Sequence, residues 1–185
     1  MKFGRHCAAR ELIEFCRPWL EPFVLCLCVR QRMAATSHTK EVVLAAHSKS
    51  MEAHASPDRV WRIWSDVSTW PRWNPDVEAI QINGPFASGT TGTMTTRSGG
   101  SHAITLQEVE PGRSFRLETA AIPLTRFAFR CEVKPSGAGA STISQSLTMQ
   151  GPLAPVFSAM MGKRIAESFD PILSGLKAEA EKDAG

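Results

Sequence analysis

The alternation of apolar and polar positions predicts a strand and then a helix at the start of the folded part of the chain. Residues 41–55 begin with an apolar run and then alternate at Met51 and Ala53, which is typical of an edge strand. Ser56 and Pro57 follow, and they favour a helix start because serine caps a free backbone N–H and proline fits the first turn. The helix is expected to bury one stripe with helical spacing, formed by Val60, Ile63, Trp64 and Val67.

The middle of the chain predicts six strands of an antiparallel sheet. After a short helical turn over residues 68–73, clusters of Gly, Pro, Asn and Ser divide residues 76–150 into six strand-length pieces. Two of these pieces, residues 115–119 and 126–134, alternate cleanly between apolar and polar side chains. A sheet with one covered face and one wet face produces this period of two.

The period becomes helical after Gly151. Apolar residues recur every three or four positions from Leu153 to Leu176, and a polar run follows. Pro171 falls inside this pattern and is expected to kink or divide the helix, because it removes a backbone hydrogen bond. A long amphipathic helix must lie along an apolar surface, and the covered face of the sheet is the one that remains. The order of elements therefore predicts one two-layer α+β domain over residues 41–185.

A set of motifs resembles the polyketide cyclase/dehydrase branch of the START-like, or SRPBCC, superfamily. The resemblance covers about residues 46–183, and its motifs are ASPDRVW (55–61), WSDV (64–67), WPRWNP (70–75), GTTG (89–92), LQEVEP (106–111) and FDP (169–171). It implies a helix-grip fold, in which a seven-stranded curved antiparallel sheet wraps around a long C-terminal helix and two short helices follow the first strand. It also implies a cavity between the sheet and that helix.

The resemblance and the inward positions together predict a pocket for a hydrophobic ligand. Short inward side chains on a curved sheet leave volume that one helix does not fill, and a persistent void is costly unless it binds a ligand. A solid, tightly packed core is the alternative. The expected ligand-binding residues are Trp70, Trp73, Met94, Leu106, Leu117, Phe127, Phe129, Gln145, Leu147, Met149, Phe157, Met160 and Met161. For the tryptophans, a structural plug against the long helix is a second interpretation.

Two functions stay open at this point. The protein either sequesters a lipid, a polyketide or another aromatic or polycyclic compound, or it is a polyketide cyclase or dehydratase acting on a poly-β-ketone in the same cavity. Candidates for a polar group inside the pocket are Gln145, Glu108, which shares the parity of Leu106, and one of Arg97 and Thr96. Binding is favoured because the sequence has no evident buried base, so its catalytic residues stay unknown.

Composition and charge exclude other classes of function. The 185 residues are 43% apolar and 21% charged, as in an ordinary globular domain. Residues 1–40 hold 7 Lys and Arg against 3 Asp and Glu, so the rest hold 14 against 15 and offer no basic patch for nucleic acid. The five histidines lack the HxxxH and HxH spacings of metal ligands, and no metal or cofactor is predicted.

Residues 1–40 form a separate basic segment. Four of the five cysteines precede residue 30, and Cys131 alone cannot form a disulfide framework, which predicts a reducing, cytoplasmic location. The apolar run at residues 23–29 is too short to cross a bilayer, so no integral membrane span is expected. Residues 1–32 are either a basic extension or an artefact of the assigned start, with translation beginning at Met33. The sequence does not specify an oligomeric state.

Overall fold

The computed structural model describes residues 44–98, 100–122 and 124–182, and it describes side chains from His47 onward except at residues 121 and 122. The predictions for residues 1–40 lie outside these residues. Within them, the element order is the predicted one: a strand, short helices, six further strands and a helical C-terminal segment.

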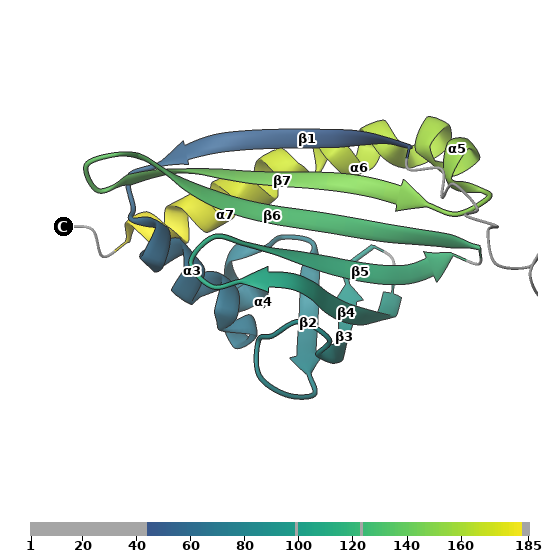
Figure 1. Ribbon diagram of the computed structural model, residues 1–185, viewed down its shortest axis with the longest axis horizontal. Coiled ribbons are helices and arrows are strands. Elements are labelled where there is room, and N and C mark those ends of the chain that lie inside the picture. The colour runs from purple at the N-terminus through teal and green to yellow at the C-terminus, as the bar shows by residue number, and fades with distance from the viewer. Residues whose placement is uncertain (1–43, 99, 123, 183–185) are drawn as a thin grey trace, which may run out of the picture. The chain divides into compact units, whose positions relative to one another are not determined.

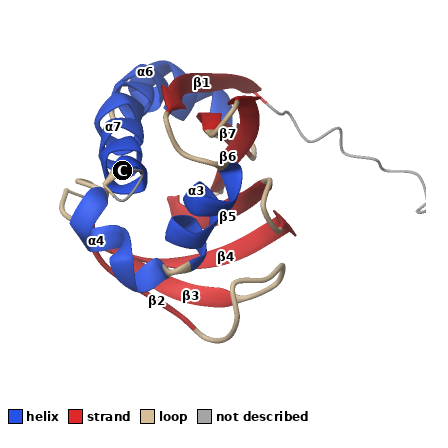
Figure 2. Ribbon diagram, turned by 90° about the vertical axis from the view of Figure 1, so that its left-hand side faces the viewer, coloured by secondary structure: helices blue, strands red, loops and turns tan. Residues whose placement is uncertain are grey.

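Seven strands form one antiparallel sheet with the order β1-β7-β6-β5-β4-β3-β2 (Figure 1). Strands β2 to β7 follow one another as neighbours, whereas β1 pairs with β7, the last of these strands in the sequence. Figure 2 shows that the sheet is strongly curved and that the helices lie on its concave side. The strands are β1 (Leu44–Ala53), β2 (Val77–Ile82), β3 (Thr91–Thr96), β4 (Gly100–Glu110), β5 (Ser114–Ile122), β6 (Thr125–Gly137) and β7 (Ala140–Gln150).

Helix α3 (Pro57–Ser65) begins as predicted. Its cap is Ser56, whose Oγ accepts a hydrogen bond from the backbone N–H of Arg59 at 3.3 Å. The predicted short turn is also present, as a 3-10 turn η1 (Val67–Thr69) and a helix α4 (Trp70–Trp73). These helices bury Val60, Ile63, Trp64, Trp70 and Trp73.

The C-terminal helical segment is divided near Pro171, as predicted. The break falls at Ser168, three residues earlier, because proline has no N–H to donate to the carbonyl four residues before it. The last helix packs against β1, β7, α3 and α4 and buries Phe169, Ile172, Leu173, Leu176 and Ala180. The parts of the segment are α5 (Ala154–Phe157), a π-helical turn η2 (Ser158–Gly162), α6 (Lys163–Glu167) and α7 (Phe169–Glu181).

Alternation gives the sheet two distinct faces. On β4, Ile104 and Leu106 are 2% and 1% exposed, whereas Thr105 and Gln107 between and after them are partly exposed. We call the concave side, which faces the helices, the inner face, and the opposite side the outer face. The buried residues that β5, β6 and β7 direct to the inner face are Phe115, Leu117, Thr119, Thr125, Phe127, Cys131, Val133, Ser141, Ile143, Leu147 and Met149.

Candidate functional site

Two rows of side chains cross the inner face, and they contain six of the residues predicted to bind a ligand. Cross-strand pairing from β4 to β7 forms the first row from Leu106, Leu117, Phe129 and Leu147. The second row consists of Ile104, Thr119, Phe127 and Met149. Met94 of β3 faces the same side, because it pairs with His102 of β4. The structure thus brings these predicted residues together.

The ring of Phe129 at the centre of the sheet is less buried than its neighbours. Leu117 and Leu147, its partners on the two flanking strands, are 4% and 0% exposed, whereas Phe129 is partly exposed. Its ring meets that of Phe169 in α7 edge-on, with centroids 6.4 Å apart. A central inward-facing ring that keeps exposed surface indicates space beside it on the inner face.

Helical segments α5 and η2 pack against the core near one end of the sheet. Ala154 is fully buried there, and Phe157 and Met161, two of the predicted ligand-binding residues, are partly buried against the core. Met160, which was predicted with them, is 74% exposed. It lies on the opposite side of the helical turn from the core and does not line the inner face.

Two buried threonine hydroxyls on the inner face have no hydrogen-bond partner among the described residues. Thr119 and Thr125 are 8% and 3% exposed, and the Oγ1 atom of each is unpartnered. They lie on adjacent strands: Thr119 of β5 pairs with Phe127 of β6, and Thr125 lies two residues before Phe127 on β6. A buried hydroxyl without a partner is energetically costly, so a polar ligand atom between these groups would be stabilising. Thr125 was not among the predicted residues, although its position two residues before Phe127 on the same strand places it on the same face.

A third, more polar row on the inner face consists of Lys49, Gln145 and Cys131. Gln145 of β7 pairs with Cys131 of β6 on one side and with Lys49 of β1 on the other, and it is partly exposed. Burial raises the pKa of the Cys131 thiol to about 12, so the thiol is neutral at pH 7 and a poor nucleophile. The Lys49 ammonium is 2.9 Å from Asp170 Oδ2 at the start of α7. Lys49 was not among the predicted residues, although it lies two residues before Met51 and therefore points to the same face of β1.

An aromatic cluster around Phe115 occupies the end of the inner face near α3 and α4. The rings with centroids 5.1–6.4 Å from that of Phe115 are Trp61, Trp64, Trp70 and Phe86. Trp70 donates from Nε1 to the carbonyl of Trp64 at 2.9 Å, and Trp73 donates to Thr69 Oγ1 at 3.3 Å. Both indoles are buried with their donors satisfied, which favours the interpretation as a structural plug over that of an entrance.

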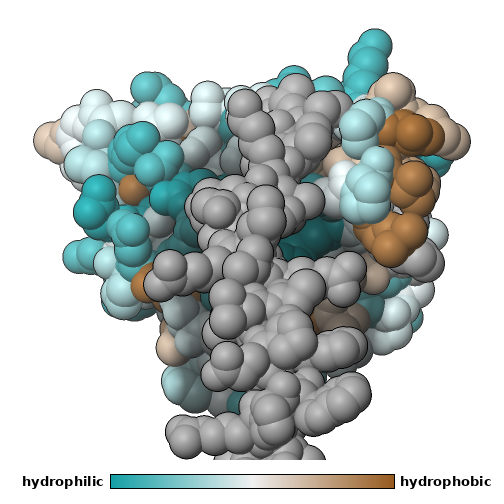
Figure 3. Space-filling model, turned by 45° about the vertical axis from the view of Figure 1, so that its right-hand side comes forward, coloured by the Kyte–Doolittle hydropathy of each residue, from teal (hydrophilic) through white to brown (hydrophobic). Residues whose placement is uncertain are grey.

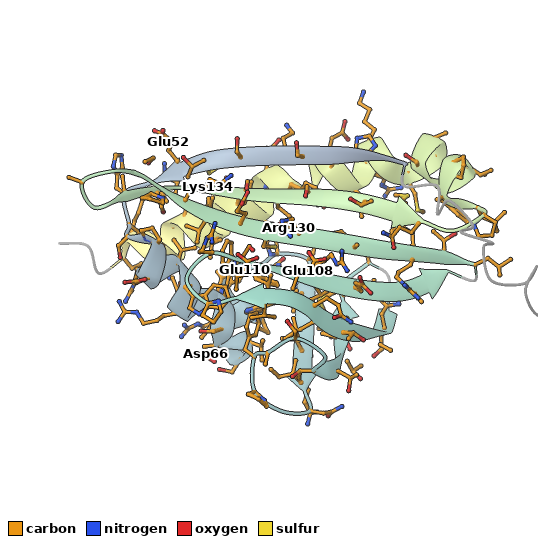
Figure 4. All side chains as sticks on the ribbon, in the orientation of Figure 1. Glu52, Asp66, Glu108, Glu110, Arg130 and Lys134 are labelled. Atoms are coloured by element: carbon orange, nitrogen blue, oxygen red, sulfur yellow. The ribbon has the colours of Figure 1, made fainter. Side chains whose placement is uncertain are left out.

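Glu108, a candidate polar group for the pocket, lies on the outer face instead. A β-bulge between Gln107 and Glu110 interrupts the alternation of β4, and Glu108 itself has a φ of 46°. Its carboxylate lies 2.9 Å from one guanidinium nitrogen each of Arg116 and Arg130 (Figure 4). The bulge therefore turns this carboxylate away from the inner face and into an ion-pair network.

The other polar candidates near the β3–β4 turn have local partners. Arg97 lies in the turn itself and donates from Nε to the carbonyl of Pro75 at 3.1 Å. Thr96 donates from its hydroxyl to the carbonyl of Gly100 at 3.4 Å. These contacts hold the turn.

A hollow of about 580 Å³ lies on the outer face, away from the residues predicted to bind a ligand. Most of its lining residues point to the face opposite the buried Ile104 and Leu106, which is the solvent side of β4 and β5. The exceptions are His102 and Thr119, which have the parity of Ile104. The lining is largely polar, unlike the apolar pocket that was predicted. It comprises Ser101, His102, Ala103, Thr105, Gln107, Glu118, Thr119, Ala120 and Arg126.

Two further findings concern metals and membranes. Among the described residues, no three His, Cys, Asp or Glu side chains come together as metal ligands would. In the part of the chain that the structure describes, no helix is both long enough and apolar enough to cross a membrane.

A family model described as polyketide cyclase/dehydrase and lipid transport matches residues 45–181. A comparison with curated proteins found no match. The matched range begins in β1 and ends with α7, so it includes the whole sheet and both ends of the inner face.

Several solved structures have a similar fold. Truncated norcoclaurine synthase from Thalictrum flavum has a TM-score of 0.60 at 18% identity, over 74% of this chain and 92% of that one. The Zhui aromatase/cyclase from Streptomyces sp. R1128 has a TM-score of 0.62 at 13% identity, over 76% and 96%. A START superfamily protein from Mycobacterium smegmatis has a TM-score of 0.61 at 18% identity, over 74% and 97%. At these identities the likeness shows the fold, which is the helix-grip of START-like proteins.

Proposed function

The chain belongs to the polyketide cyclase/dehydrase and lipid transport family, and from this premise we propose that it binds a hydrophobic small molecule between the inner face and the C-terminal helical segment. The observation that carries the proposal is the pair of buried, unpartnered hydroxyls of Thr119 and Thr125 beside apolar side chains. A ligand carbonyl or hydroxyl at this point would satisfy them, and no other described group does.

The apolar side chains around these hydroxyls suit a flat or flexible hydrophobic ligand. In the second row Phe127 is the direct neighbour of Thr119 and Met149 is the next residue beyond Phe127, and Phe129 in the first row keeps exposed surface. Methionine and phenylalanine offer polarizable surfaces that adapt to ligands of differing shape. The proposed lining is Met94, Leu106, Leu117, Phe127, Phe129, Gln145, Leu147, Met149, Phe157 and Met161, with Trp70 and Trp73 behind the closed end.

The positions of Glu108 and Cys131 favour binding over cyclisation. A cyclase needs an acid or a base beside the folded substrate. Glu108 is turned to the outer face, and Cys131 is kept neutral by burial, so neither supplies that base. The activities named for norcoclaurine synthase and for the aromatase/cyclase are those of these two proteins.

The first experiment is native mass spectrometry of the full chain after mild purification, followed by thermal unfolding with fatty acids, sterols, quinones and polyphenols. A ligand present at 100 times its dissociation constant should add about 2.7 kcal/mol to the free energy of unfolding. No copurified molecule and no stabilisation by any compound would contradict the proposal.

The second experiment locates the ligand with three matched variants. Thr119→Val and Thr125→Val should each weaken the affinity for the identified ligand by about tenfold, because each removes one hydrogen bond. Ser141→Ala is the control. The Ser141 hydroxyl is also buried and unpartnered among the described residues, but residue 141 lies opposite Ala53 of β1, at the other end of β7 from Met149. Equal affinity of all three variants and the wild type would place the ligand elsewhere.

A further inference from the structure

An exposed apolar stripe runs along α5 and η2. Leu153, Val156 and Met160 are 38%, 54% and 74% exposed, and their spacing of three and four residues places them on one side of the helical segment. The other side, with Phe157 and Met161, is apolar as well and packs against the core. A helix that is apolar on both sides is expected to be covered on both, yet this side faces solvent (Figure 3).

Leu124 extends the stripe from a second segment of the chain. It lies in the turn between β5 and β6, is 69% exposed and has a φ of 59°, a conformation that leucine rarely adopts. Gly151, between β7 and α5, lies so close to the Leu124 carbonyl that a Cβ at residue 151 would overlap it. The two segments therefore meet. We call their four exposed side chains the apolar patch: Leu124, Leu153, Val156 and Met160.

Basic side chains border the apolar patch. Lys163 and Arg164 begin α6, three and four residues after Met160, and both are exposed, with the Lys163 side chain 90% exposed. Arg126 is exposed and pairs with Gln150, directly before Gly151. Within α6 the acidic side chain is Glu167, which lies 4.0 Å from the Lys163 ammonium. The border is thus net positive and complements an anionic surface.

We propose that the apolar patch docks on a lipid bilayer that contains anionic lipids. Leu124, Val156 and Met160 enter the acyl region, while Arg126, Lys163 and Arg164 meet the lipid phosphates. Amphipathic segments with this arrangement lie in the interface plane of a membrane. The proposal goes beyond ligand binding, because it holds whichever compound the inner face takes.

The size of the patch argues for a bilayer over a second copy of the chain. Four partly exposed aliphatic side chains offer on the order of 300 Å² of apolar surface. A stable protein complex buries about 800 Å² on each partner and needs a complementary shape. A bilayer needs no such complementarity, so a small protruding patch with a cationic border is sufficient.

The test is co-sedimentation of the full chain with vesicles of phosphatidylcholine alone and of phosphatidylcholine mixed with phosphatidylglycerol. The wild type is expected to bind the mixed vesicles more tightly and to lose this preference as salt is raised. The double variant Val156→Gln, Met160→Gln should bind the mixed vesicles about tenfold more weakly, because two inserted side chains become polar. Its circular dichroism and thermal unfolding should match the wild type, since both side chains are exposed.

A charge-matched pair of variants separates local docking from general electrostatic attraction. Lys163→Gln, Arg164→Gln should weaken binding to the mixed vesicles, while Arg113→Gln, Lys134→Gln should leave it unchanged. Arg113 and Lys134 are 77% and 67% exposed, and their variant has the same change in net charge. Arg113 lies between β4 and β5, at the opposite end of β5 from Leu124, and Lys134 lies late in β6 (Figure 4). The apolar run at residues 23–29 is present in every variant.

Three results would overturn the proposal. The first is equal vesicle binding by the wild type and the Val156, Met160 variant. The second is an equal loss of binding in both charge variants, which would indicate attraction by net charge alone. The third is a wild-type dimer that becomes monomeric in the Val156, Met160 variant while vesicle binding stays the same, which would assign the patch to a second copy.

Discussion

Gly175 in α7 lies directly against the main-chain carbonyl of Trp73 in α4, and a Cβ at residue 175 would overlap that oxygen. Glycine inside a helix normally costs stability relative to alanine, so the close approach of the two helices explains its presence. This contact holds α7 against α4, and the two helices close one end of the inner face.

Gly175→Ala should therefore destabilise the protein although alanine is the better helix former. We expect a loss of about 3 kcal/mol in the free energy of unfolding, because the helices must separate to admit a methyl group. The control is Ala178→Gly, at an exposed position of the same helix, for which about 1 kcal/mol is expected from helix propensity alone. Urea denaturation measures both, and a Gly175→Ala protein as stable as the wild type would show that α4 and α7 are not in this contact.

Thr119→Val and Thr125→Val should each stabilise the ligand-free protein. Both hydroxyls are buried and unpartnered among the described residues, so replacing the hydroxyl by a methyl group removes a desolvation penalty of about 1 kcal/mol. Thermal unfolding of the protein after removal of any copurified molecule measures the effect. A clear loss of stability would mean that these hydroxyls have partners in the folded protein.

The strain at Glu108 can be measured with two substitutions. Glu108→Ala and Glu108→Gly both remove the ion pairs with Arg116 and Arg130, which are partly exposed and contribute about 1 kcal/mol in total. Glycine also relieves the backbone at a φ of 46°, so Glu108→Gly should be more stable than Glu108→Ala by about 1 kcal/mol. The opposite order in chemical denaturation would contradict the bulge at this residue.

Glu179 should make stability depend on pH. A hydrogen bond from Lys182, together with the charges of Lys182 and Arg72, lowers the pKa of the Glu179 carboxyl below its usual range. A lowered folded-state pKa stabilises the protein above the unfolded-state value of about 4.3, and this contribution is lost as the pH falls through the folded-state pKa. Glu179→Gln should therefore be about 0.5 to 1 kcal/mol less stable than the wild type at pH 7. Denaturation at pH 7 and pH 3 should show this difference shrinking in acid, and a constant difference would refute it.

The thiol of Cys131 should be unreactive while the protein is folded. Its pKa of about 12 leaves very little thiolate at pH 8, and burial blocks access as well. Alkylation by iodoacetamide, followed by peptide mapping to separate Cys131 from the other cysteines, should label this residue only after denaturant is added. Fast labelling without denaturant would indicate that the inner face opens at this point.

Local chemistry was sufficient to predict the elements and the two faces of the sheet. Ser56 and Pro57 marked the start of α3, the turn residues divided six strands, and Pro171 predicted the break at Ser168. Each of these signals depends on interactions within a few residues, so its structural effect does not depend on how the rest of the chain folds. The inward positions of β5 to β7 followed from alternation for the same reason.

The errors came from features that depend on tertiary structure. Glu108 has the parity of an inward residue, and only the pairing of β4 with β5 reveals the bulge that reverses it. Met160 belongs to a helical segment with apolar residues on both sides, so periodicity cannot tell which side meets the core. For Trp70 and Trp73 the sequence left two interpretations open, because the contact that favours the plug involves Gly175, about one hundred residues further along the chain.

The pairing of β1 with β7 also has a consequence for synthesis on the ribosome. Ala53 is synthesised 88 residues before its partner Ser141, so β1 has no strand to pair with until most of the chain has emerged. Contacts between residues so distant in sequence slow folding, because the entropy of a large loop is lost before the contacts that compensate for it can form. The nascent chain is therefore most prone to aggregate in this interval, and the arrival of β7 ends it.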